Sequence, residues 1–297
     1  MSSIKKTDDY FHTAEGKLDW RESYYFNFVD TETGTSGFTT IGILPNLRKG
    51  EFVFALFRQD KLDIYYKEQT LENAPSSESI SDGALTYRLI EPMQKWDIAV
   101  ANESFSVQLK WKARLDPFDF GVGSGTSWKG HFEQSGIADG EAAFADGRKS
   151  VRIQGFSQRD KSWGQRDWYI ESWFALHAQF ESRAIGLRKD TLNGMSYVSG
   201  GLSGVGKQLA ASSVEVQVDF DKHGKTPVGA LTTVRYADGE VDKLSSKLIS
   251  PKSFFKFSRN SPKGTTDLFE GMALHKSLQT GEVATGLIEF LFTHPKA

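Results

Sequence analysis

The residues best suited to acid chemistry in this chain are two aspartates in one short stretch. The stretch QRDKSWGQRDW, residues 158–168, repeats Gln-Arg-Asp at an interval of seven, so Asp160 and Asp167 each follow an arginine. A carboxyl group in apolar surroundings keeps its proton and can donate it, whereas a carboxylate paired with arginine stays ionised. The motif therefore predicts either a structural ion-pair network or an acid for catalysis.

The conformation at Gly164 decides how these side chains are directed. On an unbroken strand, residues seven apart point to opposite faces of the sheet. We expect Gly164 to break or bulge the strand, which lets Asp160 and Asp167 converge. In the structural alternative each arginine pairs with the aspartate that follows it, as Arg159–Asp160 and Arg166–Asp167, with Trp163 and Trp168 packed over the guanidinium planes.

A second candidate lies in HFE, where His131 and Glu133 are two residues apart. On a strand such residues share a face, so the imidazole and the carboxylate point together, either into a cavity or onto a solvated outer face. None of the six histidines lies in an HxH or HExxH motif, so no metal site is expected.

Other catalytic classes lack a sequence signal. The stretch GLSGVGKQ, residues 201–208, has phosphate-loop spacing, but Gln208 replaces the Ser or Thr that would hold magnesium. No G-x-S-x-G elbow is present, and zero cysteines exclude disulfides, thiolate metal sites and a cysteine nucleophile. Paired carboxylates for glycoside cleavage leave no sequence signature, so a carbohydrate-active sandwich stays a distant alternative.

The elements that position these groups are expected to be strands. Alternation of period two runs through the chain, for example in GFTTIGIL at residues 37–44 and KSVRIQGF at 149–156. Hairpin turns are expected at Asn102-Glu103 and at three Ala-Asp-Gly triplets, which begin at Ala138, Ala145 and Ala237. No segment of about a dozen residues has clear helical periodicity, so we predict an all-β architecture.

The composition limits the kinds of binding partner that we expect for this protein. The net charge is -2, from 36 basic and 38 acidic residues, so no positive field recruits nucleic acid or an anionic membrane surface. The N-terminal residues contain no apolar run long enough for a signal peptide or a membrane span, and we expect a cytoplasmic protein. The aromatic share of 13% suits sheets that enclose an apolar cavity. The expected partner is a hydrophobic small molecule, and a homodimer is compatible with this reading.

From His131 onward the motifs resemble a known superfamily. HFEQSG at residues 131–136, ADGEAAFADGRKSVRIQGF at 138–156 and RDKSWGQRDW at 159–168 are similar to the lipocalin-like superfamily that includes AttH-type proteins, carotenoid 1,2-hydratases (hydroxyneurosporene synthases) and kievitone hydratase. The resemblance covers residues 128–180. It implies two packed lipocalin-like antiparallel β-barrel or half-barrel domains, at residues 1–150 and 151–297, with the block at 155–173 near their interface.

The resemblance also implies the site residues. The acid candidates are Asp160, Asp167, Glu133 and His131, with no metal and no cofactor. An acid that protonates an alkene must be neutral, so we expect Asp160 to face the cavity and Asp167 to act as a brace with Arg159 and Arg166. The aromatic residues expected to bind substrate are Trp128, Trp163, Trp168, Tyr169 and Trp173.

The function so implied is acid catalysis on an apolar isoprenoid-like or polycyclic small molecule, by alkene hydration or cyclisation. The alternative is a non-catalytic carrier of lipocalin type, in which the same cavity binds a hydrophobic ligand. A carboxyl group that lines the cavity without an arginine or lysine partner would favour the enzyme.

Overall fold

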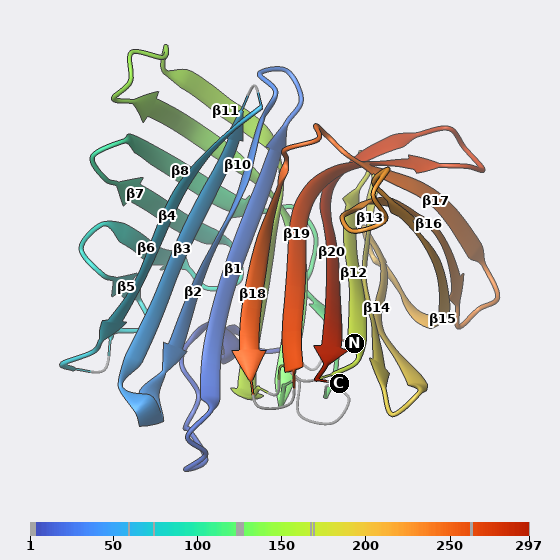
Figure 1. Ribbon diagram of the computed structural model, residues 1–297, viewed down its shortest axis with the longest axis horizontal. Coiled ribbons are helices and arrows are strands. Elements are labelled where there is room, and N and C mark those ends of the chain that lie inside the picture. Colours follow the sequence, from blue (N-terminus) through green and yellow to red (C-terminus); the bar gives the residue numbers. More distant parts are fainter. Residues whose placement is uncertain are drawn as a thin grey trace. The chain divides into compact units, whose positions relative to one another are not determined.

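The computed structural model describes residues 4–58, 60–73, 75–122, 128–166, 168, 170–261 and 264–296. The chain divides into two compact units, which Figure 1 shows. The first comprises the described residues up to Val122 together with Trp128–Arg166, and the second comprises those after Arg166. The expected boundary at residue 150 precedes β11 (Val151–Gln165), which pairs on both sides with strands of the first unit.

The first unit is one antiparallel sheet with two short 3-10 turns, η1 (Lys6–Asp9) and η2 (Pro45–Leu47). Besides β11, its strands are β1 (Trp20–Asp30), β2 (Thr35–Leu44), β3 (Lys49–Arg58), β4 (Lys61–Thr70), β5 (Ser79–Ser81), β6 (Leu85–Glu91), β7 (Lys95–Ala101), β8 (Phe105–Ala113), β9 (Phe118–Asp119) and β10 (Gly130–Phe144). They are ordered β4-β3-β2-β1-β11-β10-β8-β7-β6-β5, and β9 pairs with β10.

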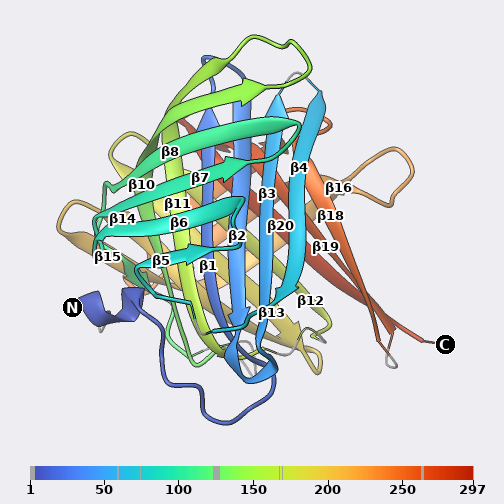
Figure 2. The same cartoon turned by 90° about the vertical axis from the view of Figure 1, so that its left-hand side faces the viewer.

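This sheet curls into a half-barrel around an aromatic core. Strands β5–β8 cross β1–β4 at a large angle, as Figure 2 shows, and the core lies between the two halves. The rings of Phe26 and Tyr87 are 5.2 Å apart at their centroids, and those of Phe54 and Phe105 are 6.1 Å apart. Such ring contacts between the halves contribute dispersion and apolar burial, which explains the high content of phenylalanine.

The second unit is a closed barrel. Its strands are β12 (Ser172–Gln179), β13 (Arg183–Leu192), β14 (Met195–Gly204), β15 (Lys207–Phe220), β16 (Pro227–Tyr236), β17 (Val241–Leu248), β18 (Phe254–Ser261), β19 (Gly264–Ser277) and β20 (Val283–Pro295). The order is β17-β16-β15-β14-β13-β12-β20-β19, and pairing of β17 with β19 closes eight strands, while β18 pairs with β19 alone. A separate core that includes Leu176, Ile185 and Ile288 lies in this unit. The predicted all-β class, a half-barrel and a barrel, is confirmed.

The predicted turns are correct except at one triplet. Asn102 turns the chain between β7 and β8, and the triplets at Ala145 and Ala237 follow β10 and β16. The triplet at Ala138 is not a turn but lies inside β10. There Gly140 is needed for close packing, because a Cβ at this residue would lie 1.8 Å from the Gln108 carbonyl oxygen of β8.

Gly164 does not break its strand as we expected. Pairing of β11 with β1 continues through Gly164 to Gln165 without a register shift. The glycine takes a φ of +131°, and a Cβ there would lie 2.4 Å from the Lys129 backbone nitrogen. The strand therefore keeps its alternation, and odd and even residues of β11 point to opposite faces as far as Gln165.

Within the described ranges, no helix has the length and hydropathy that crossing a membrane requires.

Candidate active site

The candidate site lies on one face of β10 and β11 in the first unit. Glu133 of β10 is the direct antiparallel partner of Asp160 on β11, and His131 lies two residues before Glu133, on the same face. The His131 Nε2 atom is 2.8 Å from Asp160 Oδ2 and 3.9 Å from Glu133 Oε1. The strand register thus joins three titratable side chains that come from two separate sequence motifs.

Burial differs among these three side chains. Those of His131 and Glu133 are only 4% and 7% exposed, whereas that of Asp160 is 26% exposed. Burial of both side chains contradicts the alternative of a solvated pair, although the pair lies on the sheet face opposite the aromatic core. Of these three side chains, that of Asp160 is the most exposed to solvent.

Aromatic rings hold the His131 imidazole in place. The centroid of the Phe120 ring is 4.5 Å from that of the imidazole, and Trp128 packs edge-on at 4.7 Å. The Phe120 backbone N–H donates to the His131 carbonyl oxygen at 2.9 Å, and the Trp128 indole N–H donates to the Gly121 carbonyl oxygen at 2.9 Å. These contacts give the site an apolar wall and limit rotation of the imidazole.

The environment of the second imidazole nitrogen favours one tautomer. His131 Nδ1 is buried and has no hydrogen-bond partner among the described residues. With the proton on Nε2, the imidazole donates to Asp160 and only a lone pair is left unsatisfied at Nδ1. With the proton on Nδ1, a buried N–H would be unsatisfied, which is costlier. We therefore assign the Nε2–H tautomer, with a proton held between His131 and Asp160.

Arg159 does not pair with the aspartate that follows it. Its side chain leaves β11 on the opposite face from Asp160 and forms a fully buried ion pair with Asp9 of η1. Its Nε donates to Gln134 Oε1 at 2.8 Å, and its guanidinium lies 4.9 Å from the centroid of the Phe132 ring. Arg159 thus fixes the N-terminal turn to the sheet, and the Arg159–Asp160 pair of the structural alternative does not form.

Lys161 lies on the same face as Arg159 and forms a second buried ion pair, with Glu22 of β1. Glu22 also accepts hydrogen bonds from His12 and from the Trp20 indole. Burial raises the pKa of Glu22, but the charge of Lys161 and these donors outweigh it and hold that pKa below its usual value. Burial lowers the pKa of Lys161, and Glu22 offsets only part of this shift. Glu22 therefore stays ionised, and Lys161 is the partner that loses its proton more readily.

Trp163 does not lie beside Asp160. It follows Lys161 on the core-facing side of β11, and its ring stacks on the His12 imidazole with centroids 3.9 Å apart and planes 7° apart. Gly130 of β10, its cross-strand partner, makes room for the ring, because a Cβ there would lie 2.2 Å from it. Trp163 therefore helps to anchor the N-terminal segment, and the role in substrate binding expected from the resemblance has no support in this geometry.

The rest of the motif is described in part. Arg166 donates to the Ser162 hydroxyl at 2.9 Å. Asp167 and Tyr169, expected as brace and as substrate contact, lie outside the described residues. The expected pairing of Arg166 with Asp167 therefore stays a prediction.

Trp168 and Trp173 belong to the second unit. Their rings are 5.8 Å apart, and the Arg188 guanidinium lies 4.0 Å from the centroid of Trp173. The Trp173 indole N–H donates to Glu289 Oε1, and Arg188 Nε donates to Asp190 Oδ1 at 2.6 Å. These two tryptophans form a polar and aromatic cluster of their own.

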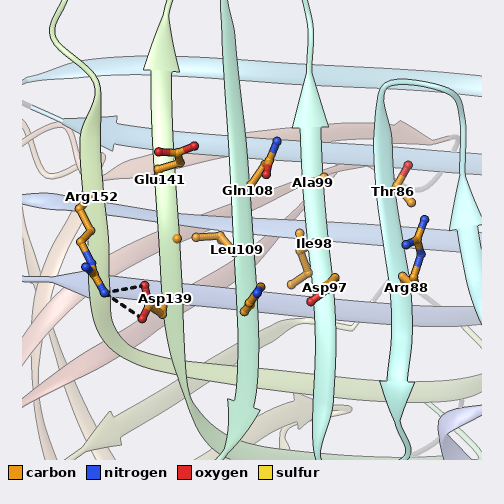
Figure 3. Close-up of a pocket in the computed structure, with 12 residues that line it drawn as sticks. Thr86, Arg88, Asp97, Ile98, Ala99, Gln108, Leu109, Asp139, Glu141 and Arg152 are labelled. Carbon is orange, nitrogen blue, oxygen red and sulfur yellow. Dashed lines mark hydrogen bonds and ion pairs between the residues drawn. The ribbon is translucent and has the colours of Figure 1, made fainter.

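A groove of about 570 Å³ crosses β6, β7, β8, β10 and β11 (Figure 3). Charged side chains of both signs line it, among them Arg88, Asp97, Lys110 and Glu141, and Arg152 donates to Asp139. Pairs of opposite charge on neighbouring strands are typical of a solvated sheet face. The groove therefore differs from the enclosed apolar cavity that the composition led us to expect.

Sequence reasoning did not identify the residues that support the site from the opposite face. Asp9 and Glu22 are buried anions in the N-terminal region, and Lys161 was part of the motif but had no role assigned. The alternation of β11 is the signal that could have separated Lys161 from Asp160. The partners of Arg159 and Lys161 are 150 and 139 residues away in sequence, so no local pattern points to them.

The fold and this group of residues define an all-β protein with a half-barrel, a closed eight-stranded barrel and a histidine–carboxylate site on the half-barrel. By sequence the chain belongs to the family described as a domain of unknown function, DUF7064, which it matches over residues 5–292. No curated protein matches it.

Two solved structures share this fold. A protein of Nitrosomonas europaea described as an AttH superposes with a TM-score of 0.71 at 12% identity, over 95% of each chain. Kievitone hydratase from Nectria haematococca superposes with a TM-score of 0.67 at 10% identity, over 97% of this chain and 93% of that chain. The resemblance seen in the motifs is thus confirmed at the level of the fold and extends over nearly the whole chain.

Proposed function

We propose that this protein is an enzyme that protonates an alkene of an apolar, isoprenoid-like small molecule and thereby adds water or closes a ring. The observation that carries the proposal is the contact of 2.8 Å between Asp160 and His131, beside Glu133 and against the rings of Phe120 and Trp128. The fold shared with a hydratase, kievitone hydratase, supports the reaction class.

In the proposed reaction Asp160, as a neutral carboxylic acid beside the neutral His131 imidazole, donates the proton and becomes a carboxylate that accepts a hydrogen bond from His131. The proton moves to one alkene carbon, and the other carbon becomes a carbocation that the face of Trp128 stabilises through its π electrons. In hydration a water molecule attacks this carbon and its proton passes to Glu133, and transfer of a proton from Glu133 to Asp160 then restores the starting acid. Glu133 and Asp160 are direct cross-strand partners, which places donor and acceptor on the same side of the sheet.

The arginine that precedes Asp160 in sequence does not pair with it. Arg159, the adjacent cation in sequence, is occupied by Asp9 on the opposite face.

Deuterium incorporation tests the proposal directly. The chain is incubated in D₂O with small molecules that carry a prenyl alkene, and deuterium bonded to carbon in the product is measured by mass spectrometry. We expect incorporation by the unmodified protein and a loss of at least 100-fold in Asp160→Asn, in line with the usual contribution of general acid catalysis. Asp139→Asn is the matched control, since Asp139 lies on the same strand face but pairs with exposed Arg152. Incorporation that persists in Asp160→Asn would remove this residue from the mechanism.

The same experiment addresses the carrier alternative. The filled aromatic core of the half-barrel shows that much of the aromatic content of this chain serves packing. Saturable ligand binding without deuterium transfer to carbon, in both the unmodified protein and Asp160→Asn, would identify a carrier.

A further inference from the structure

We propose that His131, Glu133 and Asp160 also form a binding site for one divalent transition-metal ion such as Zn²⁺. One donor atom from each of these side chains lies within 4.8 Å of the other two. Two of the three side chains are buried, unlike the exposed acidic groups that gather on protein surfaces by chance.

The distances fit the first coordination sphere of zinc. Ligand atoms bonded to Zn²⁺ at about 2.1 Å in a tetrahedron lie about 3.4 Å from each other. His131 Nε2 is 2.8 Å from Asp160 Oδ2 and 3.9 Å from Glu133 Oε1, so the observed separations bracket that value. The third separation, between donor oxygens of Glu133 and Asp160, is within 4.8 Å, so side-chain rotation can bring the three donors to one ion.

The scaffold and its access also suit a metal. His131 and Glu133 share one face of β10, and Asp160 is the direct partner of Glu133 on β11, so all three come from paired strands. Phe120 and Trp128 fix the imidazole. Asp160 is 26% exposed, so an ion can reach the group from solvent.

The chemistry of the donors selects the ion. One imidazole nitrogen and two carboxylate oxygens suit Zn²⁺ and Co²⁺, whereas Mg²⁺ prefers oxygen ligands and an octahedral shell. Two carboxylates and a neutral imidazole carry two negative charges, which one divalent ion neutralises. To bind a metal through Nε2 the neutral imidazole must carry its proton on Nδ1, so the ring changes tautomer and releases no net proton.

Other histidines near carboxylates do not offer this geometry. His12 contacts Asp8 and Glu22 through different ring nitrogens, so its donors do not converge. His294 lies 3.5 Å from Asp267 but is 63% exposed, and Lys256 already pairs with that carboxylate. Within the described part of the chain, His131, Glu133 and Asp160 are the one group of three with converging donors.

Metal and proton would then compete for the same atoms. If the function proposed above is correct, Zn²⁺ reversibly inhibits alkene protonation, since His131 and Asp160 cannot hold a metal and donate a proton at once. This consequence rests on the proposed function, whereas metal binding itself does not.

Calorimetric titration of the untagged, chelator-treated chain with ZnCl₂ tests the site. We expect one saturable site per chain and no saturable binding of MgCl₂. His131→Ala and Glu133→Gln should each weaken Zn²⁺ binding at least tenfold, and the control His294→Ala should leave it unchanged. His131→Gln, which keeps side-chain size and polarity, replaces His131→Ala if the latter fails to fold by circular dichroism.

The outcomes separate the two proposals. Absence of saturable Zn²⁺ binding, or binding that survives His131→Gln and Glu133→Gln, overturns the metal site whatever the deuterium experiment shows. Saturable binding that depends on these residues supports the site even if no alkene is protonated.

Discussion

Asp160 and Lys161 are neighbours in sequence, but their side chains lie on opposite faces of β11. Asp160 contacts His131 on one face, and Lys161 forms a buried ion pair with Glu22 on the other. The same division sends Arg159 to Asp9. One strand thus carries the candidate acid on one side and two buried ion pairs on the other, and these pairs fix the position of the strand that presents Asp160.

The Lys161–Glu22 pair should show strong coupling in unfolding experiments. Lys161→Met leaves Glu22 ionised and buried, and we expect a loss of about 3–5 kcal/mol in the free energy of unfolding. Glu22→Gln should cost less, because burial already lowers the pKa of Lys161 and lets it lose its proton. Urea denaturation of both variants and of the double variant gives the coupling energy, and simple additivity of the two losses would contradict this account.

The fold could be predicted further from the sequence than the site. Alternation and turn residues gave the all-β class and most hairpins, because these depend on neighbours in sequence. The triplet at Ala138 failed since close packing of β8 against Gly140 outweighs local turn preference. His131 and Glu133 were correctly placed on one face, but their contact with Asp160 depends on the register of β10 with β11, which no local pattern encodes.

The error at Gly164 had a direct consequence for the motif. A glycine in a strand was taken as a break, whereas here it allows β11 to continue past a backbone that approaches closely. Had the alternation been kept, Lys161 and Trp163 would have been assigned to the face opposite Asp160. Long-range partners such as Asp9 would still have been missed.

His275 should make the stability of the barrel depend on pH. It is fully buried in β19, its Nδ1 is 2.8 Å from the Ser246 hydroxyl, and burial together with nearby His177 lowers its pKa to about 3. The unfolded chain binds a proton at this residue near pH 6.5 and the folded chain only near pH 3. Between these values the unfolded state holds more protons, so stability is complete above pH 6.5 and falls as the pH decreases.

The variant His275→Gln cannot take up this proton. Between pH 7 and pH 4.5 we expect this variant to lose about 2–3 kcal/mol less stability than the unmodified protein. The reason is that pH 4.5 lies about two units below the ordinary pKa of histidine, and each unit corresponds to about 1.4 kcal/mol. Urea denaturation at the two pH values measures the difference. His223→Gln, at an exposed turn position, is the control and should follow the unmodified protein. Equal pH dependence of the unmodified protein and His275→Gln would show that His275 is not the source.

Gly164→Ala should destabilise the first unit through two separable effects. The φ of +131° is unfavourable for alanine, and its Cβ would lie 2.4 Å from the Lys129 nitrogen, which donates to the Trp163 carbonyl oxygen at 2.7 Å. Gly147→Ala is a matched control, since Gly147 has a φ of +82° but no atom within 4 Å of the added Cβ. We expect Gly147→Ala to cost about 1 kcal/mol and Gly164→Ala clearly more, as measured by urea denaturation. Equal costs would mean that Lys129 moves aside freely, and the segment before His131 would then be less firmly held than the hydrogen bond to Trp163 indicates.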